Sequence, residues 1–98
     1  MTERPRMTVQ VSNGTGLDRE VEILLNPAAR RLLISQLEKL DRNDDHLHVL
    51  SFEEDNLTLS EIPYRDGDQP VCALKISLRY DDWDKEHYPH VMERLGRK

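Results

Sequence analysis

The order of two hydrophobic periodicities constrains the fold of this chain most. Apolar residues recur at every second position in five short segments, residues 7–11, 21–25, 46–51, 57–62 and 71–80. Alternation with period two predicts half-buried β-strands. Between the second and third segments the apolar residues recur at spacings of three and four, which predicts an amphipathic helix. The chain therefore predicts an α+β fold in the order ββαβββ.

The predicted helix begins at Asn26 and Pro27 and ends near Leu40. The Asn26 side chain accepts hydrogen bonds from the free amides of the first turn, and Pro27 has no amide hydrogen that would stay unpaired. Its apolar stripe includes Ala29, Leu32, Leu33, Leu37 and Leu40. We expect this central helix to pack on one face of a single antiparallel sheet of about five strands.

Residues 46–51 and 57–62 flank a tight acidic connection and predict a β-hairpin. Successive side chains of a strand point to opposite faces of the sheet. His46 and His48 therefore lie opposite Leu47 and Val49. We expect the two apolar residues to face the helix and the two histidines to face away from it.

Residues 71–80 predict the longest strand, with Cys72, Leu74 and Ile76 on its core face. A thiol buried in apolar surroundings has a raised pKa and is inert, so we expect Cys72 to be a small core residue rather than a nucleophile. Residues 85–95 predict a short C-terminal helix with Pro89 in its first turn, where proline is tolerated.

The chain has 98 residues, which predicts one domain over residues 1–98 with a frayed polar start at residues 1–6. No apolar run approaches the roughly 18 residues that a membrane-spanning helix needs. The first residues lack the apolar stretch of a signal peptide. One cysteine excludes an intrachain disulfide. These features predict a cytoplasmic protein without a membrane partner.

The negative charge is concentrated in one segment. The chain carries a net charge of −5, whereas residues 41–68 hold nine acidic against two basic side chains, a net of −7. Such a field repels nucleic acid and attracts cationic partners or metal ions. A solvated edge that only promotes solubility is the simpler interpretation of the charge alone. No basic stripe with interleaved aromatics exists, so we expect no nucleic-acid partner.

The candidate partner-binding residues are the acidic and histidine side chains of the predicted hairpin. They are Asp44, Asp45, His46, His48, Glu53, Glu54, Asp55 and Glu61. We expect them to bind a basic protein. Trp83, Tyr80 and Tyr88 form a separate aromatic cluster, which either caps the open end of the core or anchors a partner.

The sequence holds no recognisable catalytic set, because its serines lack a nucleophile elbow and no glycine-rich loop opens a helix. We therefore expect a protein that is not an enzyme and needs no cofactor. A metal-binding alternative rests on His46 and His48 together with His87 and His90, since each pair shares one side of its element. Their spacing matches no familiar metal signature, so surface histidines are the simpler interpretation.

Four short motifs carry a resemblance to a known family. They are EILL at residues 22–25, LEKL at 37–40, DHLHVLS at 45–51 and LTLSE at 57–61. With them, the stretch between Val21 and Tyr80 resembles the thirty-second numbered family of immunity proteins, which bacteria encode beside polymorphic toxins. The resemblance implies a non-enzymatic binder that neutralises a toxin by covering its active surface. The acidic segment suits that role, because charge complementarity speeds encounter with a basic cleft.

A small structural protein is the alternative to a toxin binder. The strand predicted over residues 71–80 has the length to pair across a sheet edge with its counterpart in a second copy. Both a monomer and a homodimer are therefore compatible with the sequence.

Overall fold

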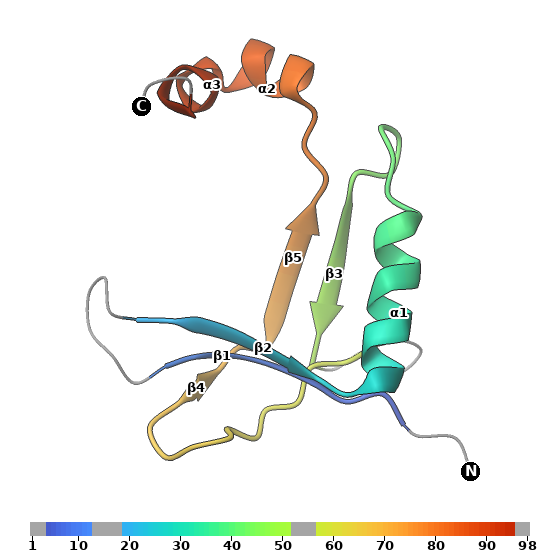
Figure 1. The fold of residues 1–98 in the computed structure, drawn as a ribbon, viewed down its shortest axis with the longest axis vertical. Helices are drawn as coiled ribbons and strands as arrows, with labels where there is room; N and C mark the ends of the chain where they lie inside the picture. The colour runs from blue at the N-terminus through green and yellow to red at the C-terminus, as the bar shows by residue number, and fades with distance from the viewer. Residues whose placement is uncertain (1–3, 13–18, 52–56, 96–98) are drawn as a thin grey trace.

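The computed structural model describes residues 4–12, 19–51 and 57–95 (Figure 1). Its elements are β1 (Met7–Val11), β2 (Val21–Leu25), α1 (Pro27–Glu38), β3 (His46–Leu50), β4 (Gln69–Pro70), β5 (Ala73–Ser77), α2 (Asp81–His87) and α3 (Pro89–Leu95). The α+β class and the antiparallel pairing are as predicted. The single five-stranded sheet is wrong, because the named strands form one sheet of three and one of two.

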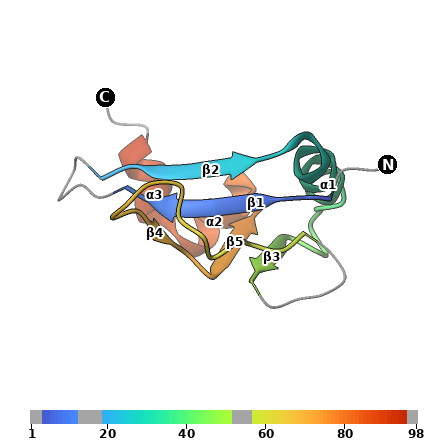
Figure 2. The same cartoon turned by 90° about the horizontal axis from the view of Figure 1, so that it is seen from below.

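The three-stranded sheet has the order β2-β1-β4, and Figure 2 shows β1 between its two neighbours. The first two strands have the predicted bounds. Val9 lies opposite Ile23 and Met7 opposite Leu25. Met7 and Val9 are almost completely buried, so this face of the sheet belongs to the core.

The two-stranded sheet pairs β3 with β5, in a register that sets Leu47 opposite Ile76. The predicted hairpin between residues 46–51 and 57–62 is therefore wrong. The second segment makes only isolated parallel bridges, one of which joins Leu59 to Met7. The Leu59 amide donates to the carbonyl oxygen of Leu50, at 3.0 Å. Leu59 is nearly fully buried, so its segment fills the space where the two sheets meet rather than extending one of them.

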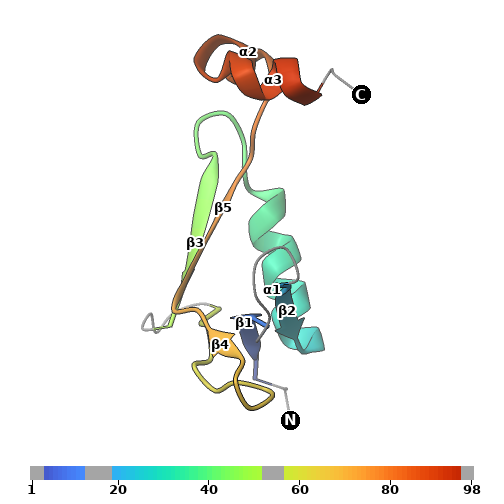
Figure 3. The same ribbon diagram turned by 90° about the vertical axis from the view of Figure 1, so that its left-hand side faces the viewer.

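Helix α1 covers one face of the β3–β5 pair, as Figure 3 shows from the side. Asn26 caps it by accepting a hydrogen bond from the Ala29 amide, at 2.9 Å. Ala29 is fully buried among the core residues, and Leu47 packs against the same cluster. His46 and His48 are exposed on the opposite face. The predicted division of β3 into an apolar and a histidine face is confirmed.

The strand predicted over residues 71–80 is shorter and changes partners at its start. The Val71 amide donates to Val9 in β1, at 2.8 Å, whereas the next carbonyl, Cys72, accepts from Ser51 beyond β3, at 3.1 Å. The inward residues Val71 and Leu74 are three positions apart instead of two, as at a β-bulge. Cys72 is consequently exposed. Its prediction as a core residue is wrong.

Two short helices replace the single C-terminal helix predicted over residues 85–95. The break falls at Tyr88, with φ −135° and ψ 59°, because a proline disfavours helical geometry in the residue before it. Pro89 opens α3. Among the described residues, no helix has the length and apolar character to cross a membrane. Residues 1–3 of the predicted frayed start lie outside the described residues, while Asn26 hydrogen-bonds to both Arg4 and Arg6.

Candidate partner-binding surface

A closed turn precedes β3 at residues 41–44. Oδ1 of Asp41 accepts hydrogen bonds from the amides of Asn43 and Asp44, both at 2.9 Å. The carbonyl oxygen of Asp45 then accepts from the Leu78 amide, at 2.6 Å. This last bond fixes the turn beside residues 78–80, which connect β5 to α2.

Arg42 joins this turn to α2. Its Nη1 and Nη2 atoms donate to the two carboxylate oxygens of Asp82, at 3.2 and 3.1 Å. The guanidinium carbon also lies 3.8 Å from the centre of the Tyr80 ring. The hydrogen bond with Asp82 raises the pKa of Arg42, and the same bond holds the pKa of Asp82 below its ordinary value. Each charged group therefore stabilises the charged form of the other.

A second arginine contacts two aromatic rings, Trp83 of α2 and Tyr88 just after it. Arg79 donates to Oδ1 of Asp84 through Nε and Nη2, at 3.0 and 2.7 Å. Its guanidinium carbon lies 4.5 Å from the Trp83 ring centre and 5.2 Å from that of Tyr88. The two rings are 40% and 44% exposed and belong to no core cluster. Of the two predicted roles, capping the core does not apply to them.

The turn and α2 together form one surface, which we call the acidic end. It contains the carboxylates of Asp41, Asp44, Asp45, Asp81, Asp82 and Asp84 and the guanidiniums of Arg42 and Arg79. With Lys85 and Glu86 of α2, the surface holds seven acidic and three basic side chains, a net charge of −4. A small cavity at its centre is lined by Arg42, Asp45, Leu78, Arg79, Tyr80 and Trp83. Asp45, both arginines and Trp83 therefore border one small cavity.

The predicted residues Asp44, Asp45, His46 and His48 do lie together at the start of β3. Nδ1 of His46 is 3.0 Å from Oδ1 of Asp45, and this contact lowers the pKa of the Asp45 carboxyl. The rings of His46 and His48 meet edge to face, with centres 5.3 Å apart. They extend the acidic end along the exposed face of β3.

Glu61, the other predicted site residue that the structure describes, does not join this surface. Glu61 is exposed, but it follows the segment that pairs with Leu50, at the far end of β3 from Asp45. Glu53, Glu54 and Asp55 lie outside the described residues. Without the predicted hairpin, Glu61 is separated from the predicted residues at the start of β3.

The sequence patterns did not predict Asp81, Asp82 and Asp84 as residues of the acidic end. Their acidic run directly after a strand is the only local signal. Nothing in their spacing connects them to Asp44, and only the pairing of β3 with β5 brings the two segments together.

The histidines do not form the metal site of the alternative hypothesis. Across residues 4–12, 19–51 and 57–95, no three histidine, cysteine, aspartate or glutamate side chains gather in a metal-ligating cluster. Nδ1 of His87 lies 2.9 Å from the Trp83 carbonyl oxygen, and the His87 ring stacks on that of Trp83 at 3.9 Å. His90 meets the edge of the Tyr88 ring instead.

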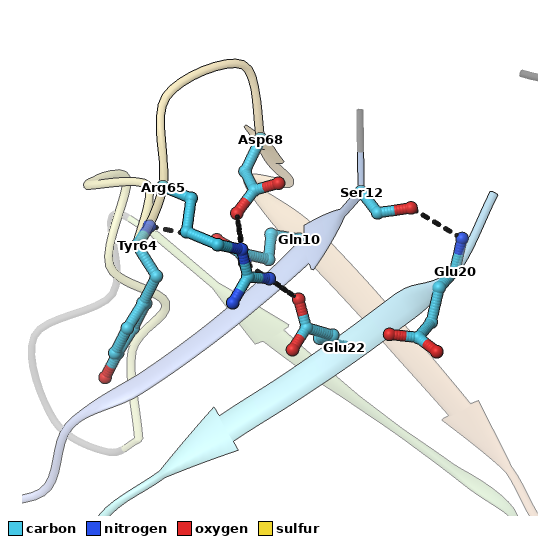
Figure 4. Close-up of polar contacts among 7 residues, drawn as sticks. All are labelled: Gln10, Ser12, Glu20, Glu22, Tyr64, Arg65 and Asp68. Atoms are coloured by element: carbon cyan, nitrogen blue, oxygen red, sulfur yellow. Dashed lines mark hydrogen bonds and ion pairs between the residues drawn. The ribbon is translucent and has the colours of Figure 1, made fainter. Parts of the chain in front are cut away.

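A buried polar network on the other side of the molecule was also missed (Figure 4). Gln10 is completely buried, and its Nε2 donates to Asp68, at 2.8 Å, and to Glu22, at 3.2 Å. Its Oε1 accepts from the Tyr64 amide, at 3.2 Å. Arg65 pairs with Glu22 and, at 3.0 Å, with Asp68. Asp68 is thus paired and buried, so it adds little to the acidic surface predicted over residues 41–68.

The sequence matches no protein-family model and no curated protein, and the fold matches no solved structure. The resemblance to the immunity family stays a prediction that rests on its four short motifs.

Proposed function

We propose that this protein is a non-enzymatic binding protein whose acidic end receives a basic protein partner. One observation carries the proposal. The bidentate Arg42–Asp82 pair joins two acidic segments, 40 positions apart in the chain, into one surface. A net charge of −4 concentrated there steers a cationic partner during encounter and disfavours acidic competitors.

Trp83 of α2 and Tyr88, which follows this helix, give the surface an anchor. Interface hot spots are enriched in tryptophan, tyrosine and arginine, and they lie inside a polar rim. Trp83 and Tyr88 are partly exposed, and Arg79 beneath them fixes their orientation. The carboxylates of Asp44, Asp81 and their neighbours supply the rim. A basic partner would cover the rings and pair its cations with the rim.

The resemblance to immunity proteins makes the proposal more specific. A partner of that kind is a bacterial toxin with a basic active cleft, which this protein would cover in the cytoplasm. The exposed thiol of Cys72 suits a reducing compartment. Neutralisation by coverage requires no catalytic residue, and the exposed carboxylates of Asp44 and Asp81 are accessible to a partner.

Co-expression with the protein encoded by the adjacent gene tests this function. Bacteria producing that protein alone should stop growing, and bacteria that also produce the full chain should survive. A variant with Asp44→Lys and Asp45→Lys should lose protection. The matched control is Glu61→Lys with Asp66→Lys, which makes the same charge change at exposed positions outside the acidic end.

Survival with the wild type and the control, but not with the acidic-end variant, supports the proposal. Equal protection by all three proteins contradicts the role of the acidic end. No protection by the wild-type chain contradicts the immunity function itself.

A further inference from the structure

The chain is less compact than a typical domain of its length. Its radius of gyration is 16.3 Å, whereas a compact domain of this length has about 12.6 Å. Its accessible surface is 7892 Å², whereas a compact monomer of its mass exposes about 5,800 Å². The excess of roughly 2,000 Å² is larger than the roughly 800 Å² that each partner buries in a standard interface. The subunit has surface available for an assembly.

One uncovered region is the outer half of the apolar sheet face. Val21 and Ile23 of β2 lie opposite Val11 and Val9 of β1, so all four side chains point to the same face. Val9 is buried there, but Ile23 is 48% and Val21 65% exposed. The core therefore covers this face at β1 and leaves it open at β2.

The second uncovered region is α3. Val91 and Leu95 are four positions apart on the helix and share one side, and Leu95 is 69% exposed. A seven-residue helix has too few internal hydrogen bonds to persist without packing. The Arg42–Asp82 and Arg79–Asp84 pairs hold α2, and with it α3, beyond the end of β5. Figures 1 and 3 both show α3 at the opposite end of the molecule from β2.

We propose that the protein forms a two-fold homodimer in which α3 of each copy packs on β2 of the other. Val91 and Leu95 of one copy then cover Val21 and Ile23 of its partner. A second copy is the occupant that fits, because both uncovered regions belong to the same chain. A two-fold exchange covers both regions on both copies, whereas a different protein would leave one of them open. This interface uses other residues than the acidic end and does not depend on the proposed function.

Sedimentation equilibrium of the full chain over a range of concentrations tests the dimer. The wild type should be dimeric. Ile23→Glu and Leu95→Glu should each raise the dissociation constant by about tenfold or more, because each places an unpaired charge at an apolar contact. Ile62→Glu is the matched control, since Ile62 is 75% exposed and lines a hollow with Thr8 on the other face of the sheet. A monomeric wild type, or a dimer that all three variants leave intact, would overturn the proposal.

Cysteine crosslinking identifies the contact directly. A chain carrying Ile23→Cys and Leu95→Cys in a Cys72→Ser background should form covalent dimers under mild oxidation. Each single-cysteine chain should not, because neither position lies against its own counterpart. A disulfide within one chain would show that α3 folds back on its own β2, and it would overturn the exchange between copies.

Discussion

Arg42 and Asp82 hold each other through two parallel hydrogen bonds, of 3.2 and 3.1 Å, at the point where the turn before β3 meets the first turn of α2. Both side chains are more than half exposed, so the pair adds little to global stability. Its effect is local, because the guanidinium also covers the Tyr80 ring just before α2. The direction of α2 therefore depends on a contact at the surface.

Replacing Arg42 by glutamine should release α2 without unfolding the protein. Hydrogen–deuterium exchange at residues 81–87 should become faster, while the thermal midpoint stays close to that of the wild type. Arg31→Gln, at an exposed position of α1, is the control and should leave exchange in α2 unchanged. Unaltered exchange in the Arg42 variant would show that other contacts hold α2.

As the pH is lowered, the contact between α2 and the turn before β3 should weaken before the core unfolds. The bond from Arg42 holds the pKa of Asp82 below its ordinary value of 3.8 in the folded chain. A carboxyl with a lowered folded pKa contributes stability above its unfolded pKa, and the contribution is lost as the pH falls through the folded value. The pKa of the Asp45 carboxyl, beside His46, is also lowered, so its contribution to stability is lost in acid in the same way.

Carboxyl NMR between about pH 6 and about pH 2 measures this effect, since the range spans the titration of ordinary aspartates. Asp82 should titrate below 3.8 in the wild type, and the depression should disappear in Arg42→Gln. An Asp82 titration at or above its ordinary value would mean that the pair does not persist in solution.

Gln10 should matter more for stability than any residue of the acidic end. Gln10→Leu removes one hydrogen bond from Asp68, which keeps its pair with Arg65, and the hydrogen bond of the Tyr64 amide. An unsatisfied buried polar group costs about 1–3 kcal/mol. Urea unfolding measures the loss. Gln69→Leu, at an exposed position of β4, should change the free energy of unfolding much less. Equal effects of the two changes would contradict the network.

Local periodicity accounts for much of the fold. The bounds of β1 and β2, the Asn26 cap and the two faces of β3 follow from residue patterns within a few positions of one another. Which strands pair with each other does not follow from such local patterns. Leu57 and Leu59 alternate like a strand, and whether they extend β3 or fill the junction depends on core contacts with Met7 that have no local signal.

The candidate site, like the fold, was predictable only where its residues are neighbours in the sequence. Asp44, Asp45, His46 and His48 are neighbours in sequence and lie together in the structure. Asp82 joins them only because β5 pairs with β3. Glu61 lies apart from them because residues 57–60 meet β3 only at its far end, at Leu50. Cys72 was misplaced because a change of strand partner shifts the alternation by one position.

A substitution of Leu59 tests how much the packing between the two sheets contributes to stability. It is nearly fully buried and bridges to β1, so Leu59→Ala should lower the free energy of unfolding by about 2–5 kcal/mol. Ile62→Ala, three positions later and largely exposed, should change it by less than about 0.5 kcal/mol. Chemical denaturation of both variants makes the comparison, and a mild effect at Leu59 would place its side chain outside the core.

The fluorescence of Trp83, the only tryptophan of the chain, reports on the acidic end most directly. The full chain is titrated with the purified basic protein that the adjacent gene encodes. We expect a saturable blue shift that the Asp44→Lys, Asp45→Lys variant loses and the Glu61→Lys, Asp66→Lys control retains. An unchanged emission in the presence of that protein, or an equal loss in both variants, would contradict the acidic end as its binding surface.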